Sequence, residues 1–397
     1  MTHRPPDSLP KFARNELTLG QMVGKGGFSL VFEIVKIDVD EVYDISRSSA
    51  IERRNVADQA VDEEGRPKFA VKMLRDDLME DEHSKGVIDL AVEARFLRRL
   101  AHPHIVAMRA TANSDPLESR FFVILEMLDG TLEGKITQWR REINKGISIW
   151  CGPLGYCCAN KNVLSHSWLE RFDVARSIAS ALKYLHQEEI IYRDLKPENV
   201  GFSNGVVKLF DFGLSKRLLP DDRVANGLYR LTGNTGSLRY MAPEVALNQC
   251  YNTKADSYSF AIVLWQICSL TVPYAGYNVR RHADEVVAKG VRPKIARSWP
   301  VSWGEVMITC WQTDIDERLS FDHILDFLND EYDILKKESD GQYVGQHVKD
   351  IRGKKKRKPD DFDINKTLDT DTRIIHEDDD GLQELELAER HHDVDLI

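Results

Sequence analysis

A short run near the middle of the chain constrains its fold more than any other feature. The run reads Tyr192-Arg193-Asp194-Leu195-Lys196-Pro197-Glu198-Asn199, and Asp211-Phe212-Gly213 follows it. Such a region holds four polar side chains suited to phosphoryl transfer: Asp194, Lys196, Asn199 and Asp211. That reaction needs an acceptor hydroxyl held in line, a divalent cation held against the phosphates, and positive charge where the transition state is negative. The run therefore predicts a phosphoryl-transfer site.

Each of the four groups has a distinct part in that chemistry. Asp194 is suited to receive the hydroxyl proton, and Lys196 is suited to stabilise the transferring group. Asn199 and Asp211 carry the hard oxygen ligands that Mg²⁺ prefers. The run resembles the catalytic loop and the metal-binding motif of eukaryotic protein kinases. The resemblance implies an α+β bilobal fold, with a small β-rich N-lobe that carries one helix, a large mainly helical C-lobe, and ATP and Mg²⁺ as cofactors in the cleft between them.

A glycine cluster near the start of the chain indicates where the nucleotide phosphates bind. Glycines let backbone N–H groups approach phosphates without a Cβ in the way. A cluster of this kind is, on its own, more often a flexible turn, but its place upstream of the catalytic run favours nucleotide binding. It resembles the kinase glycine-rich loop, with Ser29 in place of the third glycine. The ATP contacts predicted here are Gly24, Lys25, Gly26, Gly27, Phe28, Ser29 and Val31.

A lysine inside an apolar strand marks the next part of the nucleotide site. Lys72 lies in Phe69-Ala70-Val71-Lys72-Met73-Leu74, where burial without an anionic partner would be costly. Residues 92–100 have helical periodicity, and Glu93 lies one turn before Leu97 on the apolar face. The kinase resemblance implies that Lys72 contacts the α- and β-phosphates and that Glu93 holds it in place. The alternative is a solvent-exposed Lys and Glu on an amphipathic surface.

The adenine contacts are expected at residues 121–128, which read as a buried strand running into a hinge. In the kinase pattern the backbone of residues 126–128 bonds the adenine edge, and Leu125 lies behind it as the gatekeeper. A strand of the core would have much the same composition, so this interpretation depends on the resemblance. The ATP contacts expected from the strands, the helix and the hinge are Ala70, Lys72, Glu93, Leu125, Glu126 and Leu128.

Later motifs follow in the order of the kinase family. Ala242-Pro243-Glu244 matches the end of an activation segment that opens at Asp211. Asp256 matches the aspartate that holds the backbone of the catalytic loop, and Arg318 matches the arginine that pairs with Glu244. The resemblance covers residues 13–335, with the N-lobe at about 13–126 and the C-lobe at about 127–335.

Details of the motifs favour a protein serine/threonine kinase. Lys196 is typical of Ser/Thr kinases, and residues 235–244 look most like the tyrosine-kinase-like group of those enzymes. Protein substrates with Ser or Thr acceptors are therefore expected, and dual specificity stays open. A pseudokinase scaffold is an alternative, although all four polar groups are intact. A small-molecule kinase of related fold would normally lack the Ala242-Pro243-Glu244 motif.

Arg193, directly before the catalytic aspartate, indicates regulation by phosphorylation. An arginine at this place can pair with a phosphate and order the activation segment. Thr232 and Thr235 are the predicted acceptors, which implies an upstream activating kinase as a partner. The alternative is that both are ordinary loop hydroxyls.

Two residues depart from the kinase pattern. Tyr192 stands where histidine is commoner, and its expected role is packing against Phe212. Gly201 stands where the family usually has a leucine under the adenine. The missing side chain predicts a larger floor, weaker ATP binding, and partial recovery by Gly201→Leu.

Two segments are longer than the family requires. The first, at about residues 40–66, adds a polar stretch. The second, at about residues 133–167, contains three cysteines and a histidine that invite a zinc interpretation. Their spacing lacks the paired C-x₂-C form, so an irregular docking loop is favoured over a metal site. These residues are Cys151, Cys157, Cys158 and His166.

Composition agrees with a globular intracellular enzyme. The chain has 397 residues, 42% of them apolar, which is enough for a two-lobed core and a tail. Six unevenly placed cysteines do not suggest a disulfide framework. Residues 1–12 read as a flexible polar N-terminus without a secretory signal, and no stretch is long and apolar enough to span a membrane. A cytoplasmic location and no nucleic-acid partner are expected.

The acidity of the chain is concentrated in a C-terminal tail, residues 336–397. Residues 360–397 hold 14 acidic and 3 basic residues, a net charge of −11 against −10 for the whole chain. Directly before them lies Lys354-Lys355-Lys356-Arg357-Lys358, a run suited to nuclear import, with a solvated linker as the alternative. Few aromatic residues and blocks of acidic ones predict that most of the tail is disordered.

Overall fold

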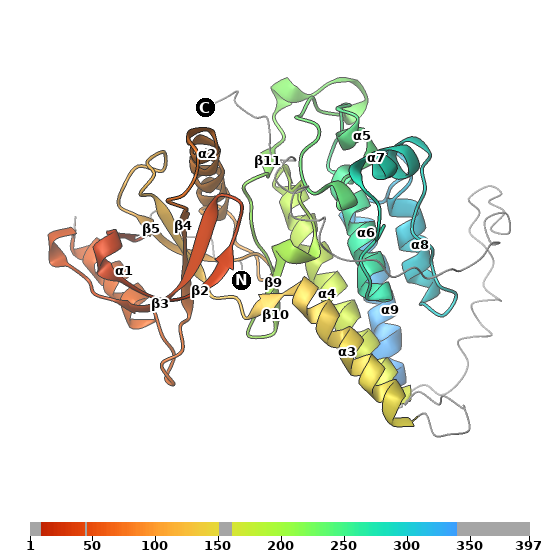
Figure 1. Cartoon of the computed structure of the whole chain (residues 1–397), viewed down its shortest axis with the longest axis horizontal. Coiled ribbons are helices and arrows are strands. Elements are labelled where there is room, and N and C mark those ends of the chain that lie inside the picture. The colour runs from red at the N-terminus through yellow and green to blue at the C-terminus, as the bar shows by residue number, and fades with distance from the viewer. Residues whose placement is uncertain (1–8, 44–45, 151–160, 340–397) are drawn as a thin grey trace.

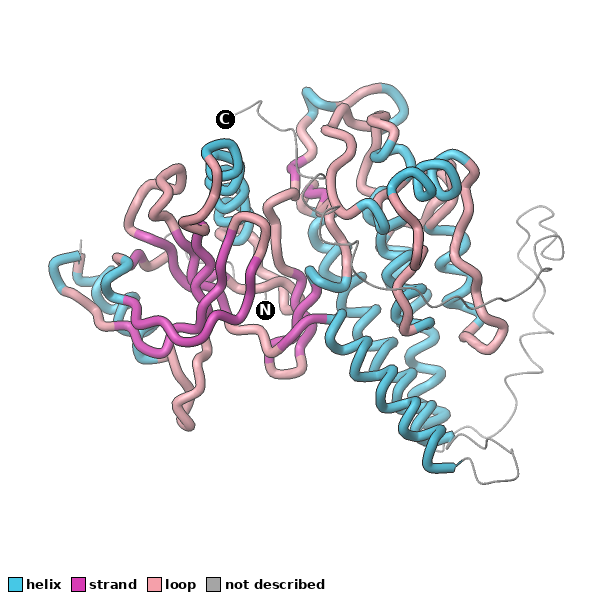
Figure 2. The backbone as a smooth tube through the Cα atoms, viewed as in Figure 1, coloured by secondary structure: helices cyan, strands magenta, loops and turns pink. Residues whose placement is uncertain are grey.

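The chain folds into a sheet-rich part and a helical part that lie beside each other (Figure 1). A computed structural model describes residues 9–43, 46–150 and 161–339. Strands gather in the N-terminal part and long helices in the C-terminal part, as the colouring by secondary structure shows (Figure 2). The predicted α+β bilobal kinase fold is confirmed.

The N-terminal part is built on a six-stranded sheet with the order β1-β5-β6-β4-β3-β2. All neighbouring pairs are antiparallel except β1 and β5. The central strands β4 and β6 are mostly apolar, and their β-branched residues Val71, Val123 and Ile124 are fully buried. The strands are β1 (Lys11–Phe12), β2 (Leu17–Lys25), β3 (Ser29–Ile37), β4 (Phe69–Leu74), β5 (Met108–Ala112) and β6 (Phe122–Glu126).

Helix α2 (Glu80–Leu97) packs beside β4 and turns one face to the sheet. Its buried residues recur every three or four positions, which is the pattern of an amphipathic helix. Three acidic residues occupy the first turn, where negative charge interacts favourably with the helix dipole and stabilises the helix: Glu80, Asp81 and Glu82. This helix presents Glu93 to the interior of the molecule.

The first insertion, expected only as a polar stretch, contains helix α1 (Arg47–Asp58). The helix begins after Ser46, whose side chain accepts a hydrogen bond from Ser49 N. Arg53, which is 1% exposed, forms an ion pair with Glu16 and lies over the Phe12 ring. Phe12 belongs to β1 and is fully buried, so residues 11–12 are part of the sheet and not of the flexible N-terminus predicted for residues 1–12.

The C-terminal part is a bundle around α6 (Lys254–Ser269), which is buried along nearly its whole length. Helix α9 (Phe321–Ser339) packs along α4 (Lys161–Gln187), and α8 (Val301–Cys310) packs against α6. Shorter elements are α5 (Pro243–Ala246) and α7 (Val279–His282). A three-stranded sheet has the order β10 (Val206–Leu209), β9 (Val200–Ser203), β7 (Gly130–Thr131). A two-stranded sheet pairs β8 (Ile190–Ile191) with β11 (Lys216–Arg217).

The second insertion is not the irregular docking loop that we expected. Helix α3 (Leu132–Trp150) extends through its first half, and α4 already begins at Lys161. Trp139 is buried in the core, and its indole Nε1 donates to Glu170 at 2.7 Å. Cys151, Cys157 and Cys158 lie outside the described residues, as does the acidic tail. No helix among the described residues combines the length and the apolar character that crossing a membrane requires.

Candidate active site

The catalytic run forms the connection between β8 and β9, and α6 holds it in place. The carboxylate of Asp256, fully buried on α6, accepts a hydrogen bond from Tyr192 N at 2.9 Å and another from Arg193 N at 2.9 Å. His186 Nε2 lies 2.8 Å from the same carboxylate. The predicted role of Asp256 in holding this backbone is therefore confirmed. Because α6 is buried along nearly its whole length, these bonds tie the loop to the core of the helical bundle.

The backbone of the site is left-handed at two non-glycine residues. Arg193 has a φ of 72° and Asp211 a φ of 62°. Such conformations are unfavourable for residues with a Cβ and cluster where function demands a particular side-chain direction. Tyr192 packs edge-on against Phe212 with ring centroids 5.4 Å apart, as predicted, and its hydroxyl donates to Phe210 O.

Asp194 is the centre of a dense polar cluster. Its Oδ1 accepts from Ser237 N at 2.9 Å and from Ser237 Oγ at 2.8 Å. Its Oδ2 accepts from Asn199 Nδ2 at 2.8 Å and lies 3.3 Å from Lys196 Nζ. Lys196 Nζ also donates to Ser237 Oγ at 2.8 Å. The cluster fixes the direction of the aspartate, and it leaves Asn199 Oδ1 as the amide atom that could ligate a cation.

A second cluster joins three separate elements at the meeting of the two parts. Lys72 Nζ, from β4, lies 2.6 Å from Glu93 Oε2 of α2 and 3.3 Å from Asp211 Oδ1. Burial alone would lower the pKa of Lys72, but the carboxylates of Asp211 and Glu93 outweigh it and raise the pKa. Lys72 therefore stays charged. Its ammonium group, suited to bind phosphates, lies close to the Asp211 carboxylate, which is suited to bind Mg²⁺.

The glycine cluster forms the turn between β2 and β3, and Gly26 N donates to Ser29 O at 2.8 Å. Ala70 pairs with Leu125 across the sheet, and both are buried. The Glu126 side chain accepts from Ala107 N at 2.7 Å and pairs with Lys208 at 2.9 Å. The predicted nucleotide residues thus lie on four neighbouring strands, in the β2–β3 turn, on α2 and in the segment that follows β6.

The structure corrects the expectation for Gly201. A Cβ built at this residue would lie 2.7 Å from Leu128 Cδ1 and 3.3 Å from Phe210 Cε1. Leu128 therefore fills the volume that the missing side chain would have left. No enlarged floor follows from Gly201, and a leucine at residue 201 would have to displace the Leu128 side chain, so recovery by Gly201→Leu is no longer the expected outcome.

The two predicted phosphate acceptors of the activation segment, Thr232 and Thr235, have different surroundings. Arg193 Nη1 donates to Thr232 Oγ1 at 2.7 Å, so this hydroxyl faces the predicted phosphate partner. Thr235 is only 9% exposed, and its hydroxyl donates to Gly233 O at 3.1 Å. The segment ends at Glu244, whose carboxylate receives two bonds from Arg318, at 2.6 and 2.7 Å, as predicted.

Sequence reasoning missed Arg75 as part of the site. Its backbone N donates to Phe28 O at 3.0 Å, and its Nη1 donates to Gly27 O at 3.0 Å. Two bonds from one residue thus hold the tip of the glycine loop. The available signal was position alone, since Arg75 follows directly on the strand that carries Lys72.

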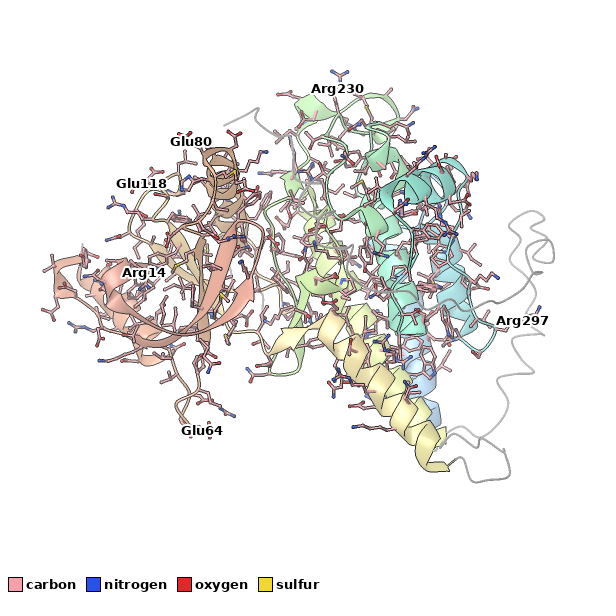
Figure 3. The ribbon with its side chains drawn as sticks, in the orientation of Figure 1. Arg14, Glu64, Glu80, Glu118, Arg230 and Arg297 are labelled. Atoms are coloured by element: carbon pink, nitrogen blue, oxygen red, sulfur yellow. The ribbon has the colours of Figure 1, made fainter. Side chains whose placement is uncertain are left out.

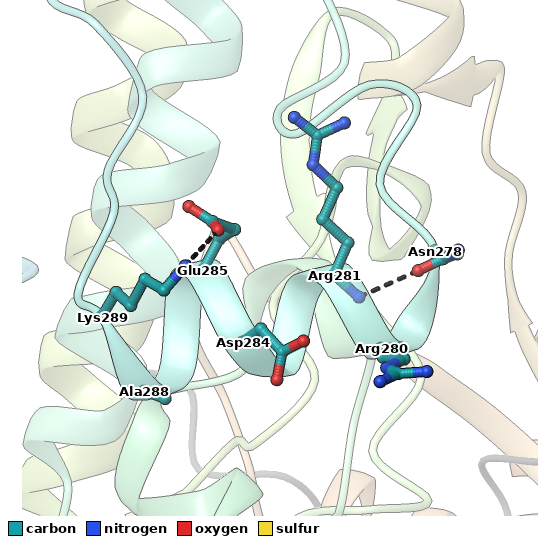
Figure 4. A pocket seen from close by; sticks show the side chains of 7 residues that line it. All are labelled: Asn278, Arg280, Arg281, Asp284, Glu285, Ala288 and Lys289. Atoms are coloured by element: carbon teal, nitrogen blue, oxygen red, sulfur yellow. Dashed lines mark hydrogen bonds and ion pairs between the residues drawn. The ribbon is translucent and has the colours of Figure 1, made fainter.

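Other charged groups lie apart from this site. Labelled side chains such as Glu64 and Arg230 project from the outer edge of the molecule (Figure 3). A surface hollow of about 540 Å³ lies along α7 and the π-helical turn Ala283–Ala288 (Figure 4). None of the predicted site residues line this hollow. Among the described residues, no three His, Cys, Asp or Glu side chains form a metal-binding group.

The sheet, the helical bundle and the two polar clusters between them define a protein kinase domain. Comparison with known families agrees. The sequence model for the protein tyrosine and serine/threonine kinases matches residues 17–328, so the chain belongs to that family.

Individual relatives carry the same kind of domain. The chain is 38% identical over 157 residues to serine/threonine-protein kinase STY17 of Arabidopsis thaliana. The matched stretch covers 39% of this chain and 26% of that protein. It is 33% identical over 263 residues to serine/threonine-protein kinase VIK of the same plant, 64% of this chain and 53% of that protein. The probable serine/threonine-protein kinase drkD of Dictyostelium discoideum is 32% identical over 303 residues, 72% of this chain and 20% of that protein. The chain therefore spans about half or less of the length of these relatives.

Proposed function

We propose that the protein is an ATP- and Mg²⁺-dependent kinase that transfers the γ-phosphoryl group of ATP to Ser or Thr hydroxyls of protein substrates. One observation carries the proposal. Lys72, Glu93 and Asp211 form one polar cluster that joins the two parts, and Asp194, Lys196 and Asn199 form a second in the connection between β8 and β9, with polar contacts of 2.6 to 3.3 Å. A scaffold without catalysis would not need this arrangement.

The residues present fit a nucleotide with its metal ion. Asp211, whose side chain is 38% exposed, and Asn199, whose amide hydrogens point to Asp194, offer oxygen ligands of the kind Mg²⁺ takes. Lys72 supplies a fixed positive charge for the α- and β-phosphates. When bound, Mg²⁺ would neutralise charge on the phosphates.

The acceptor hydroxyl belongs beside Asp194. The carboxylate accepts the hydroxyl proton, and Lys196, 3.3 Å away, stabilises negative charge on the transferring group. Ser237 bridges the two side chains and keeps their directions fixed. The relatives STY17 and VIK are both serine/threonine-protein kinases by name, which supports Ser and Thr as acceptors.

Labelled ATP with Mg²⁺ tests the proposal directly. Transfer to the protein itself and to a generic Ser/Thr substrate is measured, followed by identification of the modified residues. Asp194→Asn should lower transfer by roughly 100-fold or more, because it removes the proton acceptor. Asp330→Asn, an exposed change on α9, is the matched control and should leave transfer unchanged. Equal transfer by Asp194→Asn and the wild type would overturn the proposal.

Regulation by phosphate on the activation segment is part of the proposal. Thr232 is the favoured acceptor, since its hydroxyl already contacts Arg193. The nuclear-import role of residues 354–358 and a cytoplasmic location stay predictions from the sequence. They concern the whole protein rather than the kinase site.

A further inference from the structure

Helix α2 carries a glycine at the place where the glycine loop approaches it. A Cβ built on Gly86 would lie 2.8 Å from Phe28 Cβ and 2.9 Å from Leu74 Cδ2. Leu74 meets this position with the end of a flexible side chain, whereas Phe28 meets it with the atom fixed to the backbone. Glycine inside a helix is less favourable than alanine, so Gly86 weakens α2 in exchange for the close approach.

The tip of the glycine loop is also bonded to Arg75, the residue that follows Leu74. Arg75 donates to Gly27 O and Phe28 O, both at 3.0 Å. Asp77 orients the Arg75 guanidinium through two bonds of 2.8 and 2.7 Å. Phe28 thus accepts a bond from Arg75 at its carbonyl and approaches the bare backbone of Gly86 with its Cβ.

The same face of α2 contacts two other parts of the site. Asp89, one turn after Gly86, packs near Gly213: a Cβ built on Gly213 would lie 3.4 Å from Asp89 Cβ. Glu93, one further turn along, bonds Lys72. Residues spaced by three and four positions share one side of a helix. A single face therefore contacts the glycine loop, the segment after Asp211, and the lysine of β4.

We propose that Gly86 is a positioning residue that couples closure of the glycine loop to the Lys72–Glu93 ion pair. Its missing Cβ lets Phe28 rest on α2, so the loop and the helix hold their places together. This inference rests on the proposed function, because the phosphates of a bound nucleotide are what the loop closes on. A Cβ at residue 86 separates the two elements and displaces either the loop or Glu93.

The Gly86→Ala variant tests this coupling against Gly134→Ala. Gly134 lies on α3 and is exposed, and a Cβ there meets Thr131 Oγ1 only at 3.9 Å. The control therefore also replaces a helical glycine by alanine, but it creates no close contact like the one with Phe28. The dissociation constant of a fluorescent ADP analogue is measured at equilibrium, and melting temperatures show that each variant is folded. Gly86→Ala should weaken binding by about tenfold, the size of an overpacking effect, and Gly134→Ala should leave it unchanged.

A second substitution shows whether the effect passes through Phe28. In a Phe28→Gly background, Gly86→Ala should change the dissociation constant by less than about twofold, because the opposing atom is gone. A tenfold loss that persists there, or unaltered binding in Gly86→Ala alone, would overturn the coupling. Phosphate transfer is measured separately. A wild type that binds the analogue but transfers no phosphate defeats the proposed function, while the binding comparison still decides the role of Gly86.

Discussion

At residue 201 the side chain that fills the site comes from a distant part of the sequence. Leu128 Cδ1 lies 2.7 Å from the place of a Cβ on Gly201, although 73 positions separate the two residues. Sequence spacing could reveal the missing leucine but not its replacement. The contact between Lys72 and Glu93 was easier to predict, because a lysine in a strand needs an anion and helical periodicity put Glu93 on the inner face.

The corrected reading of Gly201 reverses the expected effect of Gly201→Leu. We expect the variant to bind a fluorescent ADP analogue about tenfold more weakly than the wild type, because the new side chain collides with Leu128 and Phe210. Adding Leu128→Ala to the same chain should restore part of the affinity. Tighter binding by Gly201→Leu alone would show that the volume is open after all.

Replacing the buried carboxyl of Glu198 should raise the stability of the protein by an amount that depends on pH. Its Oε2 is buried, and within the described residues it has no hydrogen-bond partner. Burial raises the pKa of Glu198, and the charges of Glu133 and Asp194 raise it further. A carboxyl whose folded-state pKa lies above the unfolded value loses its contribution to stability as pH rises through the folded value.

Glu198→Gln should therefore stabilise the protein at pH 7, by about 1 kcal/mol, the scale of an unsatisfied buried acceptor. At pH 4, below the ordinary pKa of glutamate, the carboxyl is largely protonated in both states and the gain should shrink. Urea denaturation at the two pH values measures the difference. A loss of stability at pH 7 would mean that the carboxylate has a stabilising partner.

At the scale of elements, the two insertions show where sequence patterns succeed and fail. Helix α3 has a readable apolar repeat, since Leu132, Ile136 and Trp139 are buried at helical spacing. The expectation of an irregular loop was wrong because it followed from the length of the insertion rather than from this repeat. Helix α1 has a weaker repeat, because Val56 and Ala57 are only partly buried against the core, and Arg53 is the one fully buried residue among its described side chains. No periodicity argument finds a helix whose buried residue is a charged one.

The activation segment yields a prediction that separates its two threonines. A phosphate on Thr232 would form charge-assisted bonds with Arg193, which now donates to the Thr232 hydroxyl at 2.7 Å and to the Tyr251 hydroxyl at 3.3 Å. Phosphatase treatment should lower the activity of the wild type by about tenfold. The same treatment should have little effect on Thr232→Val, which is already low in activity.

Thr235 is the internal comparison for that experiment. Its hydroxyl is buried and bonded to Gly233 O, so we expect mapped phosphate on Thr232 and none on Thr235. Full activity after complete dephosphorylation would show that the Arg193–Thr232–Tyr251 contacts order the segment without phosphate.

At the scale of the whole molecule, a few polar links join the sheet to the helical bundle. Lys208 of β10 pairs with Glu126 at the end of β6, His104 Nδ1 lies 3.1 Å from Val207 O, and Lys72 reaches Asp211. The order of the motifs predicted both parts and their junction. The polar links themselves could not be predicted, except for those at the motifs, because each depends on side chains brought together only by the finished fold.

A buried ion pair at the far side of the sheet joins the N-terminal segment to the first insertion. Arg53 and Glu16 are both 1% exposed at the side chain, and Glu16 also accepts from Ala13 N at 2.7 Å and Asp40 N at 2.8 Å. One carboxylate thus organises β1, the end of β3 and α1. Removing the arginine would leave it buried without its cation, which is the costly way to break such a pair.

Arg53→Met should therefore lower the free energy of unfolding by about 3 kcal/mol, while Arg54→Met should change it by less than about 0.5 kcal/mol. The neighbouring Arg54 pairs with Glu41 at 2.8 Å, but its side chain is 56% exposed, so solvent screens that pair. Urea denaturation compares the two variants, and amide hydrogen exchange locates the change. Faster exchange should appear in α1 and β1 together, because the same carboxylate holds both. Equal losses in the two variants would show that the insertion packs on the sheet without help from the buried pair.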